Sequence, residues 1–318
     1  MDAVVAAADV HTPAAAGSRS VLLLCRFHDQ AMQALTDDER ILVGDQVEGR
    51  PGPWARSVRS LVVRSNVQVD QELLDRFPLV TRVLRAGSGT DNIDLELLRR
   101  RGIALHRYPD ASAAAVAELA VAALIMLTRL IPLAHWENRE RRHRKEDLWG
   151  QPLAELEIAI WGAGPVGRAT YAELRHRCRS VAFVRHVTRD PTLPYQERSR
   201  VMEQADAHVL CLPLRPGTER LFDAGMLQAL RPKRPYLVNV GRYELWDFPQ
   251  VLAALRRGDL RGVFVDPVEE WHLPDLHAAL DGEPLNLLSS QHLGAQRVDV
   301  HLEMARWILE TIDKEPVP

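Results

Sequence analysis

Residues 157–169 of this chain read EIAIWGAGPVGRA, and this stretch decides the fold. An apolar run with β-branched residues stops at a glycine cluster, and a helical pattern follows over residues 168–176. Gly162 allows a tight turn, Gly164 lets a pyrophosphate approach the backbone, and Gly167 lets the helix pack on the strand. The free N–H groups and positive dipole end of such a helix attract phosphates. The stretch predicts a dinucleotide-binding unit, against the alternative of a glycine turn without a ligand.

The second strand of this unit, residues 180–184, ends at Arg185 and His186. An NAD-preferring site usually has Asp or Glu about 20 residues past the glycines, where the carboxylate accepts from the ribose 2′-OH. A carboxylate repels a 2′-phosphate, whereas a guanidinium such as Arg185 binds it in a bidentate way. We therefore expect NADP to be favoured, with NAD possible. The alternative is that Arg185 is a solvated charge at the end of a strand.

Composition excludes several classes of protein. The chain has 318 residues, 46% of them hydrophobic, and a net charge of −3, so we expect neither nucleic acid nor an anionic membrane surface as a partner. No apolar run reaches the roughly 18 residues of a membrane span. The three widely separated cysteines lack metal-ligand spacing and fit a reducing cytoplasm, so we expect a cytoplasmic protein without a metal site; they are Cys25, Cys178 and Cys211.

Strand patterns alternate with helical patterns along the whole chain, which is typical of a parallel α/β sheet. We expect two Rossmann-like parallel-sheet domains, one flavodoxin-like and one dinucleotide-binding, with a cleft between them. Residues 1–18 are expected to be a disordered tail, residues 19–111 and 296–318 a substrate-binding domain, and residues 112–295 the dinucleotide-binding domain. The longest helical pattern, at 112–131, is rich in Ala and Leu and ends near Pro132. Such an apolar helix is suited to join domains or to pack on a partner subunit.

Six stretches occur in the order found in one enzyme family. They are Val63-Arg64-Ser65, Arg85-Ala86-Gly87-Ser88-Gly89-Thr90-Asp91-Asn92-Ile93-Asp94, Val116-Ala117-Glu118-Leu119, the glycine motif, residues 237–247 and Gln291-His292-Leu293-Gly294. With them the chain resembles the D-isomer-specific 2-hydroxyacid dehydrogenases, which include phosphoglycerate, glyoxylate/hydroxypyruvate and phosphite dehydrogenases. The resemblance covers nearly everything from Ser20 to the C-terminus. It implies a homodimer that buries the 112–131 helix across a two-fold interface.

The resemblance also implies three catalytic positions. Arg242 matches the arginine that holds the substrate carboxylate and polarises its carbonyl, and His292 matches the acid/base histidine. The family's glutamate, which hydrogen-bonds that histidine, lies in a segment that departs here and reads DPVEEWHLP from Asp266. A one-residue deletion in the alignment places Glu270 there, and we expect Glu270 to take this role. Trp271 in an ungapped alignment, Glu269, or no partner at all are the alternatives.

Further binding positions follow from the same resemblance. Ser65, with the backbone of Ser88 and Gly89, is expected to bind the substrate, and Asp266 the nicotinamide amide. Two glycines usually follow the arginine, but Tyr243 and Glu244 stand there, and a carboxylate at Glu244 would narrow the pocket or repel anionic substrates. The remaining positions expected along the cofactor are Pro165, Val166, Leu212, Pro213, Thr218, Val240, Gly241 and Gly294.

These residues imply an NADPH-dependent oxidoreductase that reduces a small 2-keto acid to the D-2-hydroxy acid. One alternative is a nucleotide-binding, corepressor-like relative in which the chemistry is vestigial. Another is a dehydrogenase of a phosphonate-type or other specialised-metabolite anion.

Overall fold

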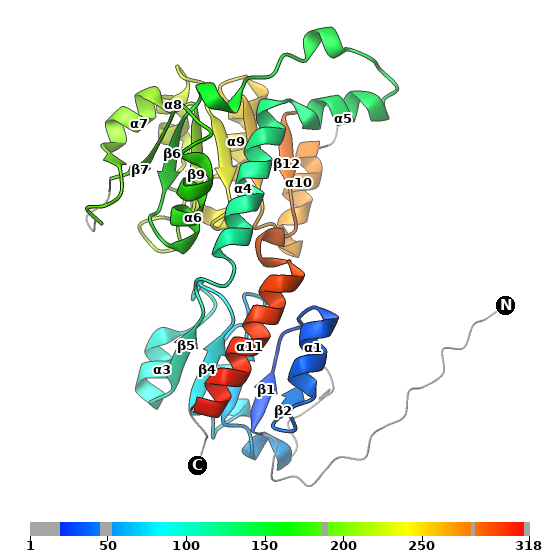
Figure 1. Cartoon of the computed structure of the whole chain (residues 1–318), viewed down its shortest axis with the longest axis vertical. Coiled ribbons are helices and arrows are strands. Elements are labelled where there is room, and N and C mark those ends of the chain that lie inside the picture. Colours follow the sequence, from blue (N-terminus) through cyan, green and yellow to red (C-terminus); the bar gives the residue numbers. More distant parts are fainter. Residues whose placement is uncertain (1–19, 45–52, 186–189, 281–283, 315–318) are drawn as a thin grey trace, which may run out of the picture. The chain divides into compact units, whose positions relative to one another are not determined.

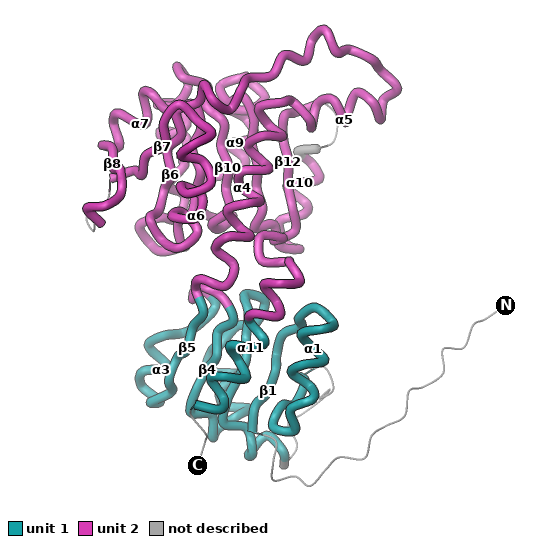
Figure 2. The backbone as a smooth tube through the Cα atoms, viewed as in Figure 1, with its two compact units in different colours: residues 1–86, 92–108, 304–318 teal, residues 87–91, 109–303 magenta. Residues whose placement is uncertain are grey.

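The computed structural model describes residues 20–44, 53–185, 190–280 and 284–314. The chain divides into two compact units (Figure 2). Unit 1 comprises residues 1–86, 92–108 and 304–318, and unit 2 comprises residues 87–91 and 109–303. Compared with the expected domains, the loop 87–91 belongs to unit 2, and the C-terminal division falls inside a helix rather than before it. The tail expected at 1–18 lies outside the described residues.

Unit 1 is a five-stranded parallel sheet in the order β2-β1-β3-β4-β5 (Figure 1). This is the flavodoxin-like order, as expected from the sequence. Its strands are β1 (Val21–Leu23), β2 (Ile41–Val43), β3 (Ser60–Val63), β4 (Arg82–Arg85) and β5 (Ala104–Arg107). Its helices are α1 (Asp29–Thr36), α2 (Gln71–Arg76), α3 (Leu95–Arg101) and the C-terminal part of α11 (Val298–Lys314).

Unit 2 is a seven-stranded parallel sheet in the order β12-β11-β10-β9-β6-β7-β8. This is the dinucleotide-binding order with one additional edge strand, β12, so the expected fold class is confirmed. Its strands are β6 (Glu157–Trp161), β7 (Ser180–Val184), β8 (Tyr195–Gln196), β9 (Ala207–Leu210), β10 (Tyr236–Asn239), β11 (Gly262–Val265) and β12 (Leu287–Ser289). Its other helices are α4 (Ala113–Thr128), α5 (Ile131–Arg139), α6 (Pro165–Leu174), α7 (Arg198–Gln204), α8 (Ala224–Leu230), α9 (Phe248–Arg256) and α10 (Leu273–Leu280).

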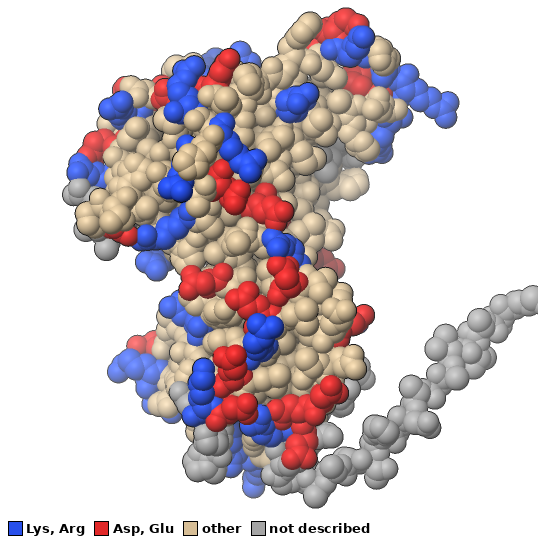
Figure 3. All heavy atoms as spheres, in the orientation of Figure 1, with Lys and Arg blue, Asp and Glu red and all other residues tan. Residues whose placement is uncertain are grey.

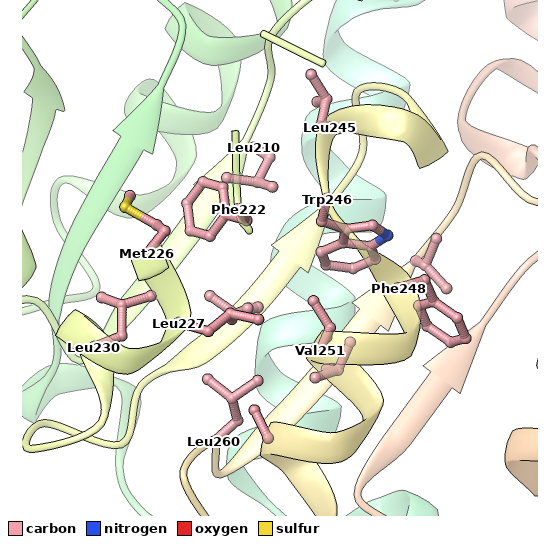
Figure 4. Packing of buried hydrophobic residues seen from close by; sticks show 14 of the residues in the cluster. Leu210, Phe222, Met226, Leu227, Leu230, Leu245, Trp246, Phe248, Val251 and Leu260 are labelled. Atoms are coloured by element: carbon pink, nitrogen blue, oxygen red, sulfur yellow. The ribbon is translucent and has the colours of Figure 1, made fainter. Parts of the chain in front are cut away.

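The sheet of unit 2 is buried on both faces, and alternate residues of each strand enter different cores. Ile158 and Ile160 of β6 pack in one core with α4 and α6, while Ala159 and Trp161 pack in the other with α8 and α9. Figure 4 shows part of the second core, in which Leu210 of β9 and Met226 and Leu227 of α8 lie near Phe222, while Phe248 and Val251 of α9 pack further along the same cluster. Continuous apolar strands such as β6 are typical of parallel sheets covered by helices on both sides.

The single helix expected over 112–131 is wrong, because the helix ends at Thr128 and a second helix begins at Ile131. Leu130 between them has a left-handed backbone (φ 55°), which no helix interior tolerates. No single helix in the described ranges is long and apolar enough to cross a membrane; only α4 and α5 taken together pass that test, and they meet at 64°. Ten residues of α4 are buried inside the protein, so its apolar composition is largely explained by its own unit.

Candidate active site

The glycine loop has the geometry predicted from its sequence. Gly162 has φ 106°, and an added Cβ there would meet the Cys211 carbonyl oxygen at 2.8 Å. A Cβ on Gly167 would collide with the Gly162 carbonyl, so α6 can approach β6 only with glycine at this position. A Cβ on Gly164, by contrast, has open space around it. Gly164 precedes α6 without any side-chain cap, so the first N–H groups of the helix face that space.

A cavity of about 840 Å³ opens at this edge of the sheet. Its walls include the glycine loop and, beyond β9, the expected Leu212, Pro213 and Thr218. Among the described residues, four arginines and one carboxylate line the cavity. They are Arg168, Arg185, Arg198, Arg215 and Asp190. A glycine-lined helix N-terminus beside several guanidiniums suits a ligand with more than one phosphate. The residues present therefore fit a dinucleotide.

Two arginines of this cavity form ion pairs with carboxylates. Arg168 Nη1 lies 2.7 Å from Asp190 Oδ2, and Arg185 pairs with Glu197. Glu197 is the residue that sequence reasoning missed, because it follows β8 and lies 12 positions after Arg185 in the sequence. The carboxylate that the sequence lacks at the end of β7 is therefore supplied by Glu197, beside Arg185. His186, expected to help here, lies outside the described residues.

The loop after β10 lies close to the loop after β9, and the latter is closed by its own side-chain hydrogen bonds. A Cβ on Gly241 would meet the Leu212 carbonyl oxygen at 2.6 Å, so the loops after β9 and β10 pack without a side chain between them. Val240 is buried beside it. Thr218 accepts from the Arg215 N–H (2.9 Å) and donates to the Pro213 carbonyl (2.7 Å), which closes the loop 213–218.

Arg242 begins the loop after β10, and the buried Asn239 holds that loop in place. The Asn239 amide donates to the Arg242 carbonyl (2.7 Å) and accepts from the Gly241 N–H (3.0 Å). The Arg242 guanidinium donates from Nε and Nη2 to the two carboxylate oxygens of Asp91, at 3.0 and 2.9 Å. Its Nη1 donates to the Gly241 carbonyl (2.8 Å). The Arg242 guanidinium thus holds a carboxylate in the bidentate geometry typical of this side chain, and in this structure that carboxylate belongs to Asp91.

The structure brings the predicted Ser88–Gly89 loop to Arg242. A Cβ on Gly89 would collide with Nη2 of Arg242, so a larger residue here would displace the guanidinium from its present position. Asp91, two residues further on, had no role assigned from the sequence. Ser65 lies just after β3 in unit 1 and is half-buried.

The acid/base pair is formed by His292 and Glu269. His292 Nδ1 lies 2.7 Å from Glu269 Oε1, and because a carboxylate only accepts, the ring N–H donates. This leaves Nε2 to exchange a proton with a substrate. The hydrogen bond from His292 is the largest cause of the lowered pKa of Glu269, to which the Arg242 charge also contributes, while burial opposes the shift.

The expectation that Glu270 pairs with His292 is wrong. Glu269 precedes a 3-10 turn, Glu270–His272, as its N-cap, and Glu270 begins the turn with an exposed side chain. The chain leaves β11 through a tight turn in which the Val268 N–H donates to the Asp266 carbonyl (2.6 Å). That turn shortens the segment by one residue more than the alignment assumed.

Asp266, the expected nicotinamide partner, fixes the loop that carries His292. Its buried carboxylate accepts from the Ser290 hydroxyl (2.7 Å) and from the N–H groups of Leu293 (2.7 Å) and Gly294 (3.0 Å). Its carbonyl accepts from the His292 N–H (2.7 Å). These bonds hold His292 in a left-handed backbone conformation (φ 56°), which a non-glycine residue adopts only when its surroundings impose it. A Cβ on Gly294 would meet Asp266 Oδ2 at 2.9 Å.

Glu244 faces a second, smaller cavity of about 430 Å³ together with Tyr243 and His272. Its carboxylate lies 3.7 Å from Nε2 of His272. Tyr243 and Glu244, which follow Arg242, therefore both lie against His272.

A dinucleotide-binding sheet, a carboxylate-binding arginine and a carboxylate-oriented histidine define an NAD(P)-dependent oxidoreductase that acts on a small carbonyl or hydroxyl compound. Residues 121–294 match the family model for the NAD-binding domain of D-isomer-specific 2-hydroxyacid dehydrogenases. The chain is 30% identical over 270 residues to an (S)-sulfolactate dehydrogenase of Chromohalobacter salexigens, covering 79% of this chain and 84% of that protein. The chain belongs to the D-isomer-specific 2-hydroxyacid dehydrogenase family.

A longer relative and a solved structure are also similar to this chain. A D-3-phosphoglycerate dehydrogenase of Bacillus subtilis is 26% identical over 303 residues; the match covers 92% of this chain but 56% of the longer relative. The fold matches an NADPH-dependent glyoxylate/hydroxypyruvate reductase from Sinorhizobium meliloti, solved in complex with NADP and malonate, with a TM-score of 0.76, 23% identity and coverage of 93% of each chain.

The pairing of Glu269 with His292 predicts a contrast between two adjacent residues. Glu269→Gln removes the charge that stabilises the protonated ring and should lower kcat/KM by about 10²-fold, the lower range for acid/base catalysis. Glu270→Gln is the matched control and should stay within about twofold of the wild type, because the effects of exposed side chains without special contacts are small. Steady-state kinetics of both variants decide the point. Equal losses in the two variants, or a loss only in Glu270→Gln, would contradict the assignment.

Proposed function

We propose that this protein reduces a small 2-keto acid to the D-2-hydroxy acid and prefers NADPH. The observation that carries the proposal is that one unit holds both the Glu269–His292 pair at 2.7 Å and the bidentate fork of Arg242. The charge of Arg242 contributes to the lowered pKa of Glu269, so the two groups act in one electrostatic environment. The glycine loop and the arginine-lined cavity belong to the same unit.

The chain's own residues would act as follows. Arg242 would bind the substrate carboxylate as it binds that of Asp91 and would polarise the adjacent carbonyl. His292 would donate a proton from Nε2 to the carbonyl oxygen during reduction and would accept it again in the reverse reaction. Glu269 would keep the ring oriented through the hydrogen bond to Nδ1. The dihydronicotinamide of the cofactor supplies the hydride when it is bound.

Steady-state turnover with a panel of acids tests this function directly. We expect NADPH oxidation with glyoxylate, hydroxypyruvate or phenylpyruvate, and (S)-sulfolactate is added in the reverse direction because the Chromohalobacter relative is named for it. Cofactor binding without turnover of any such acid would instead favour a nucleotide-binding, corepressor-like protein. Turnover of phosphonate-type anions alone would favour the specialised dehydrogenase.

Arg242 should be indispensable. Arg242→Ala should lower kcat/KM by an amount that corresponds to about 3 kcal/mol or more of lost transition-state stabilisation, because a charge-assisted bidentate contact to the reacting acid is lost. Arg242→Lys should recover only part of this, since an ammonium cannot form the two-pronged contact. Near-wild-type kinetics in the alanine variant, with an intact fold by circular dichroism, would rule out this role.

Cofactor preference should depend on Arg185 and on its newly found partner. A charge-assisted hydrogen bond contributes about 1.5–3 kcal/mol, so kcat/KM should favour NADPH over NADH roughly tenfold to a hundredfold. Arg185→Asp should invert the preference, because it removes an attraction and adds a repulsion. Glu197→Gln should raise the preference for NADPH, since the guanidinium is freed from a competing carboxylate.

The measurement is kcat/KM with both cofactors and one keto acid for the wild type and both variants. If Glu197→Gln weakens NADH use without helping NADPH, Glu197 serves the ribose 2′-OH instead, and NADH is the preferred cofactor. An unchanged ratio in Arg185→Asp would show that Arg185 is only a solvated charge.

We also propose a cytoplasmic homodimer that uses the α4–α5 region. Alongside the buried face of α4, Ile125, Met126 and Ile131 are 39%, 37% and 42% exposed, and Trp149 in the following segment is 81% exposed. Figure 1 shows α5 and that segment reaching beyond the sheet of unit 2. Elsewhere on the face drawn in Figure 3, acidic and basic side chains are interspersed.

Sedimentation tests the dimer. The wild type should be dimeric at micromolar concentration, and the double variant Ile125→Glu with Ile131→Glu should be monomeric, because charges are costly in an apolar interface. Glu118→Ala, on the exposed side of the same helix, is the control for surface changes. A monomeric wild type would count against the proposal.

A further inference from the structure

The two side chains that follow Arg242 contact one residue, His272. The rings of Tyr243 and His272 are stacked, with centroids 3.7 Å apart and planes inclined by 10°. Glu244 Oε1 lies 3.7 Å from His272 Nε2. Tyr243 packs further on Phe248, at a centroid distance of 5.3 Å, and Figure 4 shows Phe248 beside Trp246 within the core below this loop. The loop that begins at Arg242 is therefore anchored on the His272 ring.

The same His272 ring holds the backbone of Glu269. The Glu269 N–H donates to Nδ1 of His272 (3.1 Å), and the His272 N–H donates back to the Glu269 carbonyl (2.9 Å). The two residues form a capping box around the turn Glu270–His272. Glu269 is the residue whose carboxylate orients His292. One imidazole thus contacts both the Arg242 loop and the acid/base pair.

This arrangement requires a neutral ring. Nδ1 accepts a hydrogen bond, so the ring proton is on Nε2, which faces Glu244. His272 is 9% exposed, and this burial lowers its pKa, while the carboxylates of Glu244, Glu269 and Asp275 oppose the shift. The other charged groups that line the adjoining cavity are Glu219, Arg220 and Asp247. A second proton on the ring would turn Nδ1 into a donor and deprive the Glu269 N–H of its acceptor.

We propose that His272 is a positioning residue that fixes the Arg242 loop and the Glu269–His292 pair in one arrangement, through its stack on Tyr243 and its hydrogen bond from the Glu269 N–H. The inference rests on the proposed function of that site. The two contacts use different properties of the imidazole, namely its flat face and its acceptor nitrogen, and can therefore be removed separately.

Two substitutions separate them. His272→Phe keeps an aromatic face for Tyr243 but has no acceptor, so the acid/base pair should lose its anchor: kcat should fall about tenfold with little change in the KM for the keto acid. His272→Asn keeps an oxygen near the place of Nδ1 but loses the stack, so the KM for the keto acid should rise about fivefold with kcat nearly unchanged. Glu270→Gln, at the exposed position that begins the same turn, is the control and should alter neither constant.

The pH profile of keto-acid reduction is a second readout. In this direction His292 must carry its proton, so its protonation does not reduce the rate. Because the pKa of His272 is lowered from 6.5, kcat in the wild type should fall as the pH drops through a range below 6.5. Both His272 variants should lack this limb, since neither replacement titrates there; the loss of rate on protonation of Glu269, whose pKa is lowered from 4.5, is common to all three proteins and is not counted as this limb. A wild-type limb retained in either variant, or equal effects of the two variants on kcat and KM, would overturn the proposal.

Amide hydrogen exchange of Glu269 tests the hydrogen bond without any turnover. Protection should be high in the wild type and in His272→Asn and should be lost in His272→Phe, and equal protection in all three would overturn the proposal. Failure of the proposed function looks different, because the wild type would then reduce no keto acid while the exchange pattern of Glu269 persisted.

Discussion

One constraint underlies the whole site: in a parallel sheet every strand ends at the same edge. In unit 2 the segments that follow β6, β9, β10 and β11 carry in turn the glycine loop, Leu212, Arg242 and Glu269. The segment after β12 carries His292. Residues separated by more than a hundred positions in the sequence therefore serve one edge, and no individual loop has to be long. The apolar faces that α4, α6, α8 and α9 cover keep this edge rigid.

Buried polar groups then convert strand ends into positioned loops. Asn239 satisfies groups on both sides of Gly241, and the Asp266 carboxylate accepts three hydrogen bonds from the segment that carries His292. A buried carboxylate is costly unless such donors surround it, so the loop and Asp266 require each other. The left-handed backbone of His292 is stabilised by the same bonds. Asp266 therefore has a structural role at the site, whatever else it contacts.

The departures from the family pattern compensate each other. Tyr243 and Glu244 replace small residues after Arg242, and both meet His272, which lies in the other departing segment. The sequence shows these changes as separate losses of a motif, 29 positions apart for Tyr243 and His272. In three dimensions they form one packed contact around His272, next to Arg242 on one side and Glu269 on the other.

The fold class and the strand–glycine–helix unit could be predicted from the sequence, because both depend on local pattern. The sequence also indicated Arg242 and His292 as candidates, because few other residue types can replace them. The sequence could not show which carboxylate lies beside His292. A difference of one residue in the length of the turn after Asp266 decides between Glu270 and Glu269, and the structure shows Glu269 there. The sequence also missed Asp91, Glu197 and the break at Leu130. The first two act across 151 and 12 positions of the chain, and the third depends on backbone conformation. Such pairings form only in the folded chain. Side chains pair with groups that are close in space, and closeness in space cannot be read from separation in the sequence.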